Sequence, residues 1–523
     1  MNPSETFFKV YLRDYYAPRG KRNIRATRRY GYHVVDELEY WFHVEQGLPK
    51  HRSNGNLRLS DCQNIISYTV GQLAWPRTYF GISIPTLRKR NVERLDLLSR
   101  LSRFTGTVTI RVNGLHQKNA PMPTIPKNVG QVNLRVLPLG EFFDSHADIF
   151  SQLSKLQRID VSSSFRIDQG DDLFRHLTNL TRLDVSDGTQ IELTGSDFAR
   201  FPQLRHLNMA DYGPNIDINT ALRHVTQLTN LNVSSCGFIN LRKTTLMRLT
   251  NLRVLNLANC LGAKITDKTF QHLSKLTSLN ISGLDRTAIT DELFGHLPQL
   301  KSLDASCCIQ SRLTVGLLGH LTELTRLDVS ETDFFLDSSN HDGFAQVGKT
   351  LQSLTMRGCT IYTDKPFSYM SNLTELDMSN CQCEQSAWKT LQFPLSLQVL
   401  NAWNCFEGEM MDRHFMYFSK LTRLSMQRIN GTCTTDQAFS HLTNLKWLNM
   451  GGCCQTTITD HAFTHLSGLT FLDMGDCTQT TITDAAFSHL SELRGLFMDG
   501  CNEPTITKDT IKRLPNLNSV LYP

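Results

Sequence analysis

The chain has 523 residues, with 54 Lys or Arg against 49 Asp or Glu, so its net charge of +5 is small for its length. This balance does not require a polyanionic partner such as nucleic acid or an anionic membrane. No stretch approaches the roughly 18 consecutive apolar residues of a membrane span, and "MNPSETFFKVYLRDYY" lacks the apolar centre of a secretory signal. We therefore expect an intracellular protein in the cytoplasm, with the nucleus as the alternative, and no membrane partner.

Residues 1–56 form a basic, aromatic-containing N-terminal segment. They hold ten Lys or Arg and six Asp or Glu, a net charge of +4 that leaves +1 for residues 57–523. Basic segments of this kind bind nucleic acid, serve as nuclear addresses, or are solvated leaders. The solvated leader is the favoured interpretation, and nucleic acid is disfavoured as a partner. The basic residues in "PRGKRNIRATRRY" are Arg19, Lys21, Arg22, Arg25, Arg28 and Arg29.

A repeat of mostly 24 residues fills the second predicted domain, residues 57–523. "ITDHAFTHLSGLTFLDMGDCTQTT" (458–481) is followed directly by "ITDAAFSHLSELRGLFMDGCNEPT", with Ile, Asp, Phe, His, Leu, Met and Cys in register. We take the Leu of "LDM" as the marker residue and count about twenty units, the last near Val520. The markers are Ile159, Leu183, Leu207, Leu231, Leu255, Leu279, Leu303, Leu327, Leu354, Leu376, Leu400, Leu424, Leu448, Leu472 and Leu496, with fainter copies expected at Leu57, Ile84, Ile110 and Leu134.

Two irregular units interrupt the period. The segment "ETDFFLDSSNHDGFAQVGKT" (331–350), which includes Phe334 and Phe335, lengthens one unit to 27 residues. We expect a 22-residue unit around "CQCEQSAWKTLQFPLSLQ" (381–398). Insertions in repeat arrays form loops on one rim that are either functional or neutral, and the sequence favours neither.

Each unit combines a strand pattern with a helical pattern. "LTFLDM" alternates apolar and polar residues, which predicts a strand with Leu472 and Met474 inside and Asp473 outside. "TDHAFTHL" spaces Phe463 and Leu466 as a helical turn does, behind Thr459 or Asp460 as the N-cap. A unit this short cannot bury its own apolar face, so neighbouring units must stack. The predicted fold is an α/β solenoid with a curved parallel sheet inside and short helices outside.

The pattern "ITDxxFxHLxxLxxLxMxxC" resembles leucine-rich repeats, in particular the cysteine-containing subclass that follows F-box domains in substrate receptors of ubiquitin ligases. The resemblance covers residues 57–523 and implies binding of a protein by the repeat surface. It also raises the alternative that residues 1–56 are a degenerate F-box. An F-box opens with Leu-Pro before its helices, whereas here Leu48 and Pro49 follow the predicted helical stretch "YHVVDELEYWFHVEQGLP".

Nine of the 14 cysteines stand five residues after a marker, where the chain leaves its strand. We expect them to be free thiols that fill a buried slot and act as weak S–H donors. Parallel side chains in register seldom aim at one another as a disulfide requires, and one Cys per unit gives a row instead of a tetrahedral metal site. The nine are Cys236, Cys260, Cys308, Cys359, Cys381, Cys405, Cys453, Cys477 and Cys501.

Eight histidines stand seven residues before a marker, at the end of the predicted helical turn. A repeated histidine indicates a structural column, and we expect these rings to donate to carbonyls left open at the helix ends. Neither the Cys nor the His pattern indicates catalysis, a cofactor or a metal site. The eight are His176, His224, His272, His296, His320, His441, His465 and His489.

The position after the marker is Asp or Asn in most units. We interpret it as a polar structural ladder, with an acidic stripe that selects a basic ligand as the alternative. Its members are Asp160, Asp184, Asn208, Asn232, Asn256, Asn280, Asp304, Asp328, Asp377, Asn401, Asn449 and Asp473.

The candidate partner-binding site lies where the last units depart from this pattern. Four aromatic residues occupy strand positions predicted to face solvent, with Arg and Gln among them, and such residues are common in interface hot spots. Misregistered core aromatics and packing between neighbouring repeats are the alternatives. The candidate residues are Trp403, Arg423, Gln427, Arg428, Trp447, Phe471 and Phe497.

The predicted function is a non-enzymatic scaffold that binds a protein partner on the concave face, without a small-molecule substrate. A substrate-recognition subunit of a cullin ubiquitin ligase, with a cullin adaptor as partner, is the first alternative. An extracellular adhesin is a further alternative, which the thiol ladder disfavours. An enzyme with such repeats would need a separate catalytic domain, and the sequence ends inside a repeat at "LPNLNSVLYP".

Overall fold

The computed structural model describes residues 156–160, 174–187, 193–213, 216–236, 241–260, 265–284, 289–308, 313–332, 342–362, 365–383, 390–405, 410–429, 433–501 and 506–521, and four strand backbones before them. The chain divides into two compact units, residues 1–252 and 253–523. Each unit is described by itself.

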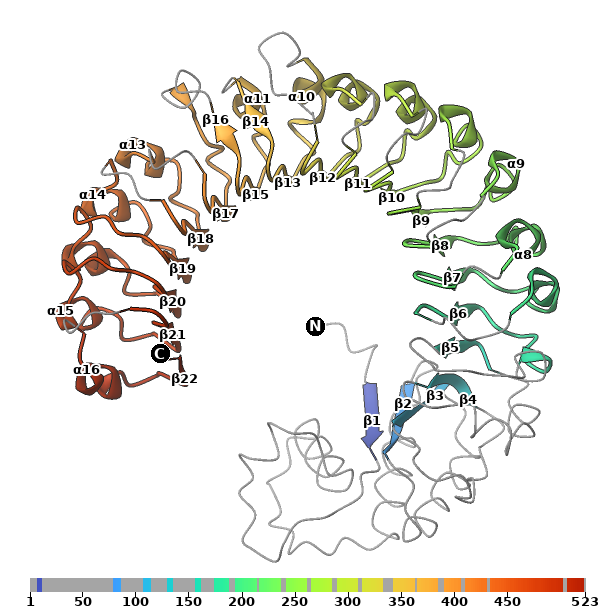
Figure 1. Cartoon of the computed structure of the whole chain (residues 1–523), viewed down its shortest axis with the longest axis horizontal. Coiled ribbons are helices and arrows are strands. Elements are labelled where there is room, and N and C mark those ends of the chain that lie inside the picture. The colour runs from blue at the N-terminus through green and yellow to red at the C-terminus, as the bar shows by residue number, and fades with distance from the viewer. Residues whose placement is uncertain are drawn as a thin grey trace, which may run out of the picture. The chain divides into compact units, whose positions relative to one another are not determined.

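Unit 2, residues 253–523, is built on a parallel sheet with one strand per repeat. Within this unit the strands line the inner edge of the ribbon and the helices line the outer edge (Figure 1). The strands are β9 (Val254–Asn256), β10 (Ser278–Asn280), β11 (Ser302–Asp304), β12 (Arg326–Asp328), β13 (Ser353–Thr355), β15 (Glu375–Asp377), β17 (Val399–Asn401), β18 (Arg423–Ser425), β19 (Trp447–Asn449), β20 (Phe471–Asp473), β21 (Gly495–Phe497) and β22 (Ser519–Leu521). Two outer strands, β14 (Thr360–Ile361) and β16 (Gln382–Cys383), pair separately.

The predicted marker register is confirmed throughout unit 2. Leu472, for example, pairs with Leu448 on one side and Leu496 on the other, and Leu496 pairs with Val520. One predicted spacing is wrong, because the 22-residue step separates Leu354 from Leu376, while the segment 381–398 belongs to a 24-residue step. The 22-residue repeat therefore directly follows the 27-residue repeat instead of lying one repeat later.

Unit 1, residues 1–252, also has parallel strands. They are β1 (Phe7–Tyr11), β2 (Tyr79–Pro85), β3 (Thr107–Asn113), β4 (Val129–Leu134), β5 (Arg158–Asp160), β6 (Arg182–Asp184), β7 (His206–Asn208) and β8 (Asn230–Asn232). Strand β1 lies inside the predicted N-terminal segment and pairs with β2. The helical stretch proposed there and the copy at Leu57 lie outside the described residues.

The register of the faint repeats needs correction. Ile110 is at the marker position as predicted, but it pairs with Ile82 and Val132, two residues before the predicted Ile84 and Leu134. Side chains two residues apart on a strand share a face, so alternation alone does not distinguish these registers.

The helices are short because one repeat must hold a strand, two turns and a helix. The α-helices are α8 (Ile218–His224), α9 (Lys243–Leu246), α10 (Asp342–Val347), α11 (Lys365–Tyr369), α13 (Asp412–Phe415), α14 (Asp436–Phe439), α15 (Asp484–Phe487) and α16 (Lys508–Arg513). The 3-10 helices are η3 (Gly195–Arg200), η4 (Asp267–Thr269), η5 (Asp291–His296), η6 (Val315–His320) and η8 (Asp460–His465).

Thr459 caps η8, since its side chain accepts a hydrogen bond from the backbone N–H of His461. The adjacent Asp460 has a different role, because its carboxylate accepts from the backbone N–H of Thr483 at 2.6 Å and from the Thr483 hydroxyl at 2.7 Å. Each such pair, which we call a Thr–Asp clasp, joins consecutive repeats. The other clasps are Asp267–Thr290, Asp291–Thr314, Asp412–Thr435, Asp436–Thr459 and Asp484–Thr507.

The core follows the predicted pattern. Leu472, Met474, Phe463 and Leu466 are all buried, whereas Asp473 is half-buried at the inner surface. Equivalent apolar residues of the other described repeats are buried too, so neighbouring repeats within each compact unit pack against one another.

A left-handed turn follows every described marker-bearing strand from β6 to β21, that is, all of them except the outer strands β14 and β16. The residue four positions after the marker has positive φ in each of these repeats, and this conformation favours Gly, Asn and Asp. The residues are Asp187, Asp211, Ser235, Asn259, Gly283, Cys307, Glu331, Gly358, Asn380, Asn404, Arg428, Gly452, Asp476 and Gly500.

Candidate functional site

The side chains of the Asp/Asn ladder form hydrogen bonds mainly with other groups of the protein. The Asp473 carboxylate accepts from the backbone N–H of Gly475 at 3.0 Å and from the Asn449 side-chain amide at 2.9 Å. The Asn208 amide likewise donates to Asp184 at 3.0 Å. These bonds close a turn after each strand and join neighbouring turns, which supports the structural interpretation of the ladder. The side chain of Asp160 lies outside the described residues.

The cysteine ladder also joins repeats. The Cys453 thiol donates to the carbonyl oxygen of Met426 in the preceding repeat at 3.1 Å, and Cys477 donates to Met450 at the same distance. Burial raises the pKa of Cys453 to about 12 and also raises that of Cys477. Equivalent bonds are made by Cys236, Cys308, Cys359, Cys381, Cys405 and Cys501. All the described cysteines are free thiols, as predicted.

The histidine column differs from the prediction. Seven of its rings are exposed and His465 is half-exposed, and within the described residues none of the eight donates to a helix-end carbonyl. The carbonyls that they were expected to cap accept backbone N–H groups instead, as Phe463 does from Leu466. The column is therefore a feature of the outer surface.

The structure brings four of the seven candidate residues together on the inner face of β18–β21. The Arg423 guanidinium lies 5.2 Å from the centre of the Trp447 ring. Trp447 stacks on Phe471 with ring centres 5.5 Å apart and an interplanar angle of 6°, and the Phe471 and Phe497 rings are 5.3 Å apart. Gly495 is the register partner of Phe471, so no side chain separates Phe471 from Phe497. We call these four residues the aromatic row.

The row is accessible although its members touch one another. Arg423 is exposed, and Trp447, Phe471 and Phe497 are half-buried. Arg423, Trp447 and Phe471 occupy the same position on three neighbouring strands. These strands are about 4.8 Å apart, so the side chains lie close enough to stack. The rings cover each other's faces, so their edges are the surface left for a partner.

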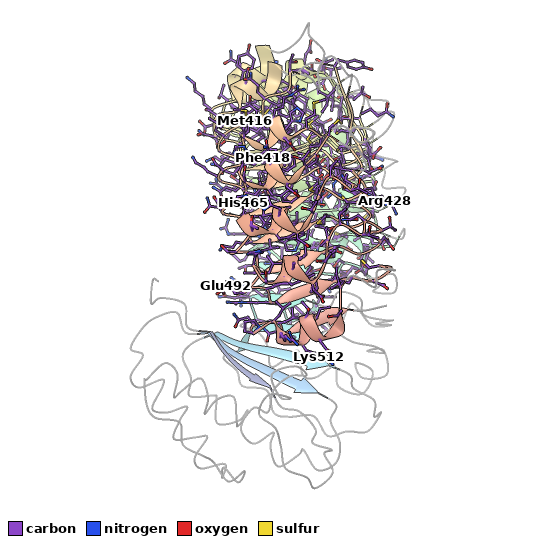
Figure 2. All side chains as sticks on the ribbon, turned by 90° about the vertical axis from the view of Figure 1, so that its left-hand side faces the viewer. Met416, Phe418, Arg428, His465, Glu492 and Lys512 are labelled. Atoms are coloured by element: carbon purple, nitrogen blue, oxygen red, sulfur yellow. The ribbon has the colours of Figure 1, made fainter. Side chains whose placement is uncertain are left out.

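The other three candidates lie elsewhere. Trp403 and Gln427 stand three residues after their markers, four positions further along the strand direction than Arg423 and Trp447. Arg428 occupies the left-handed turn after β18, and Figure 2 shows it at the edge of the array, away from His465. The seven residues therefore do not form one cluster.

Sequence analysis missed a second group at the position before the marker. Arg158, Arg182 and His206 are register neighbours on β5, β6 and β7 of unit 1. Aligning the units on their markers and comparing that position would have found them.

Among the described residues, no group of three or more His, Cys, Asp or Glu side chains has a metal-binding arrangement. In the same part of the chain, no helix has the length and apolar character needed to cross a bilayer.

Comparisons with known proteins agree with the repeat architecture. The sequence matches the family described as leucine rich repeat over residues 226–286, and the family described as BspA type leucine rich repeat region over residues 408–523. No characterised protein matches by sequence.

Two solved structures that match this chain differ in how closely their folds resemble it. One is the TLR13–ssRNA13 complex, with a TM-score of 0.50 and 18% identity, covering 88% of this chain and 69% of that chain. The other is an internalin (inlF) from Listeria monocytogenes, with a TM-score of 0.31 and 18% identity, covering 71% of this chain and 82% of that chain.

The repeats, the parallel inner strands and the family matches define a leucine-rich repeat protein. Proteins of this class are binding scaffolds. The resemblance of residues 1–56 to an F-box finds no support in these comparisons.

Proposed function

We propose that this protein is a non-enzymatic scaffold that holds a protein partner against the inner strands of unit 2, with the aromatic row as the main contact. The observation that carries the proposal is the accessible stack of Trp447, Phe471 and Phe497 beside Arg423. At the position of Trp447 and Phe471, several other repeats of this unit carry small polar residues, for example Ser278 and Ser302.

Half-buried aromatic side chains contribute most when a partner removes their remaining surface from water. Trp, Tyr and Arg are enriched in interface hot spots, where truncation of one residue costs about 2 kcal/mol or more of binding free energy. A scaffold that held its rings only for folding would bury their edges in its own core.

The geometry favours a protein partner over a nucleic acid. Bases bind aromatic residues by stacking on ring faces, but Trp447 and Phe471 stack on each other, and Arg423 lies over Trp447. Ring edges suit aliphatic or aromatic side chains of a protein. The RNA in the TLR13 complex is therefore not proposed as a ligand for the aromatic row.

The test is quantitative affinity purification from cells, followed by titration calorimetry with each recovered partner. We expect Trp447→Ala with Phe471→Ala to weaken binding at least about tenfold, because two contact residues are lost. Thermal unfolding should change little, since contacts between the rings contribute only about 0.5–1.5 kcal/mol.

The matched control is Val254→Ala with Ser278→Ala, which changes the same strand position in two neighbouring repeats. It should leave the affinity within roughly twofold. Unchanged binding by the aromatic double variant would move the site elsewhere, and global unfolding of that variant would make the rings part of the core.

The ubiquitin-ligase alternative rests on the cysteine-containing repeats and on residues 1–56. The same purification distinguishes it, because a substrate receptor would recover a cullin adaptor through residues 1–56 independently of the aromatic row. Deletion of residues 1–56 should then remove the adaptor and leave the partner of the aromatic row bound.

We also propose a reducing, cytoplasmic location. The thiols of the cysteine ladder act as hydrogen-bond donors between repeats, and oxidation would remove that proton. Fluorescence microscopy of the tagged protein tests this location, and secretion would contradict it.

A further inference from the structure

Three basic side chains form a second row on the strands of unit 1. Arg158, Arg182 and His206 are consecutive register partners on β5, β6 and β7. Both arginines are exposed and His206 is half-buried. Arg205, which is also exposed, directly precedes His206. We call Arg158, Arg182 and His206 the basic row.

The basic row has no counter-ion of its own among the described residues. No ion pair there involves Arg158, Arg182 or Arg205. The nearest carboxylate on β6, that of Asp184, accepts hydrogen bonds from Asn208 and from Ser186. Side chains two residues apart on a strand are about 6.6 Å apart, so Asp184 lies beside the row without being part of it.

Burial and the surrounding positive charge both lower the pKa of His206. Burial has the larger effect, and the charges of Arg182, Arg158 and Arg205 lower the pKa further. Its other neighbours are Asn230 on β8, which is uncharged, and Asp184 on β6. The ring is therefore neutral at pH 7 and would become charged readily only beside an added anion.

We propose that the basic row binds carboxylates of an acidic peptide segment that runs across β5, β6 and β7. Two strand spacings, about 9.6 Å, separate Arg158 from His206. Three residues of a peptide in the polyproline II conformation rise about 9.3 Å and complete one turn, which returns the side chain to the same side. Carboxylates at every third residue of such a segment therefore match Arg158 and His206, while Arg182 contacts the segment between them.

The charge of Asp184 favours separate carboxylates over nucleic acid. A phosphodiester chain carries a charge on every nucleotide and would bring phosphates near this neighbouring carboxylate. A peptide can place its acidic residues on the basic row and neutral residues beside Asp184. This site belongs to unit 1 and is independent of the aromatic row.

The test is fluorescence anisotropy with the full chain and a labelled, capped peptide in which every third residue is Glu and the others are Ser. We expect Arg158→Gln with Arg182→Gln to weaken binding about tenfold, because charge-assisted hydrogen bonds are lost. The same peptide with Gln in place of Glu should bind at least about tenfold more weakly to the unchanged protein.

The matched control is Arg326→Gln. Arg326 is exposed at the same strand position but has Ser302 and Ser353 as register partners, so it stands alone. This variant should keep the affinity within roughly twofold. Circular dichroism of each variant should match that of the unchanged protein, and Arg182→Glu alone gives a second measurement at an exposed position.

The pH dependence tests His206 directly. A bound carboxylate raises the pKa of His206, so binding takes up a proton and tightens as pH falls from about 7.5 towards 6. His206→Gln should remove this tightening, so that the affinity no longer rises as the pH falls from about 7.5 towards 6.

Four results would overturn the proposal, three with the peptides and one with a nucleic acid. The first three are absence of peptide binding, equal binding of the Glu and Gln peptides, and unchanged binding by the Arg158 and Arg182 double variant. Tighter binding of a labelled oligouridylate than of the Glu peptide would also overturn it and would indicate a nucleic-acid site.

Discussion

Cys453 illustrates how one side chain serves both the core and the connection between repeats. It is fully buried, and its thiol donates to Met426 in the previous repeat. A buried thiol costs little to desolvate, whereas a buried thiolate would be unfavourable, so the pKa rises to about 12. The side chain is therefore a structural donor and a poor nucleophile.

We expect the buried thiols to react far more slowly with a maleimide than the exposed ones in the native protein. With a pKa of about 12, only roughly one Cys453 thiol in ten thousand is ionised at pH 8. Mass spectrometry after timed labelling should show modification first at Cys307, Cys433 and Cys454, which are exposed.

Denatured protein is the control, and there all cysteines should react at similar rates. Rapid native labelling of Cys453 would contradict its buried position. The raised pKa also predicts that stability is full below the unfolded thiol pKa of about 8.5 and falls as pH rises towards 12, since the unfolded state then releases protons that the folded state keeps.

At the scale of elements, the Thr–Asp clasp fixes where each outer helix begins. Thr459 caps η8, and Asp436 of the preceding repeat accepts from the Thr459 backbone N–H and hydroxyl. Sequence analysis found the cap but left Asp460 as an alternative cap, because a single unit does not reveal that its Asp reaches the next one.

We expect Asp460→Ala to lower the free energy of unfolding by about 1–2 kcal/mol, since two hydrogen bonds to Thr483 are lost. Asp460→Asn should cost less, because its amide oxygen can still accept one of them. Chemical denaturation monitored by circular dichroism measures both.

The control is Asp509→Ala, which removes an exposed ion pair with Lys512 at 3.2 Å. Its cost should not exceed about 0.5 kcal/mol, as is usual for exposed pairs. Equal costs for Asp460→Ala and Asp509→Ala would mean that the clasp does not contribute to stability.

Strong periodicity predicted the strands well, and weak periodicity predicted them less well. Leu472 and its counterparts in unit 2 pair as expected, but Ile82 replaces Ile84 because two-residue alternation leaves the register open. The aromatic row was only partly predictable. Trp403 is at a solvent-facing position, but it follows its marker, whereas Trp447 precedes its marker. Sequence analysis grouped the aromatic residues without comparing their positions relative to the markers, so it did not separate the two.

At the scale of the whole molecule, stability in a repeat array is close to a sum of local terms and contacts between neighbours. The described strands of unit 2 pair in chain order, each with the strand of the adjacent repeat. A local defect should therefore loosen nearby repeats and leave distant ones protected.

Phe463→Leu tests this in unit 2. The ring is fully buried, and the substitution should cost roughly 1–2 kcal/mol. Hydrogen exchange with mass spectrometry should show faster exchange in β19–β21 and unchanged exchange in β9–β11.

Phe270→Leu is the matched control, because Phe270 is also buried and stands nine residues before its own marker, Leu279, as Phe463 does before Leu472. This variant should accelerate exchange near β10 and leave exchange in β19–β21 unchanged. Equal acceleration across all strands of unit 2 by either variant would indicate one cooperative block.

The left-handed residue after each inner strand divides a repeat into a part of constant length before it and a part of variable length after it. Strand and turn have the same length in every described repeat from β6 to β21, whereas the distance to the next marker ranges from 22 to 27 residues. A change of loop length therefore leaves the spacing of inner side chains intact. The inner face can change its ligand by substitution while the rims change by insertion, so the two surfaces are free to evolve separately.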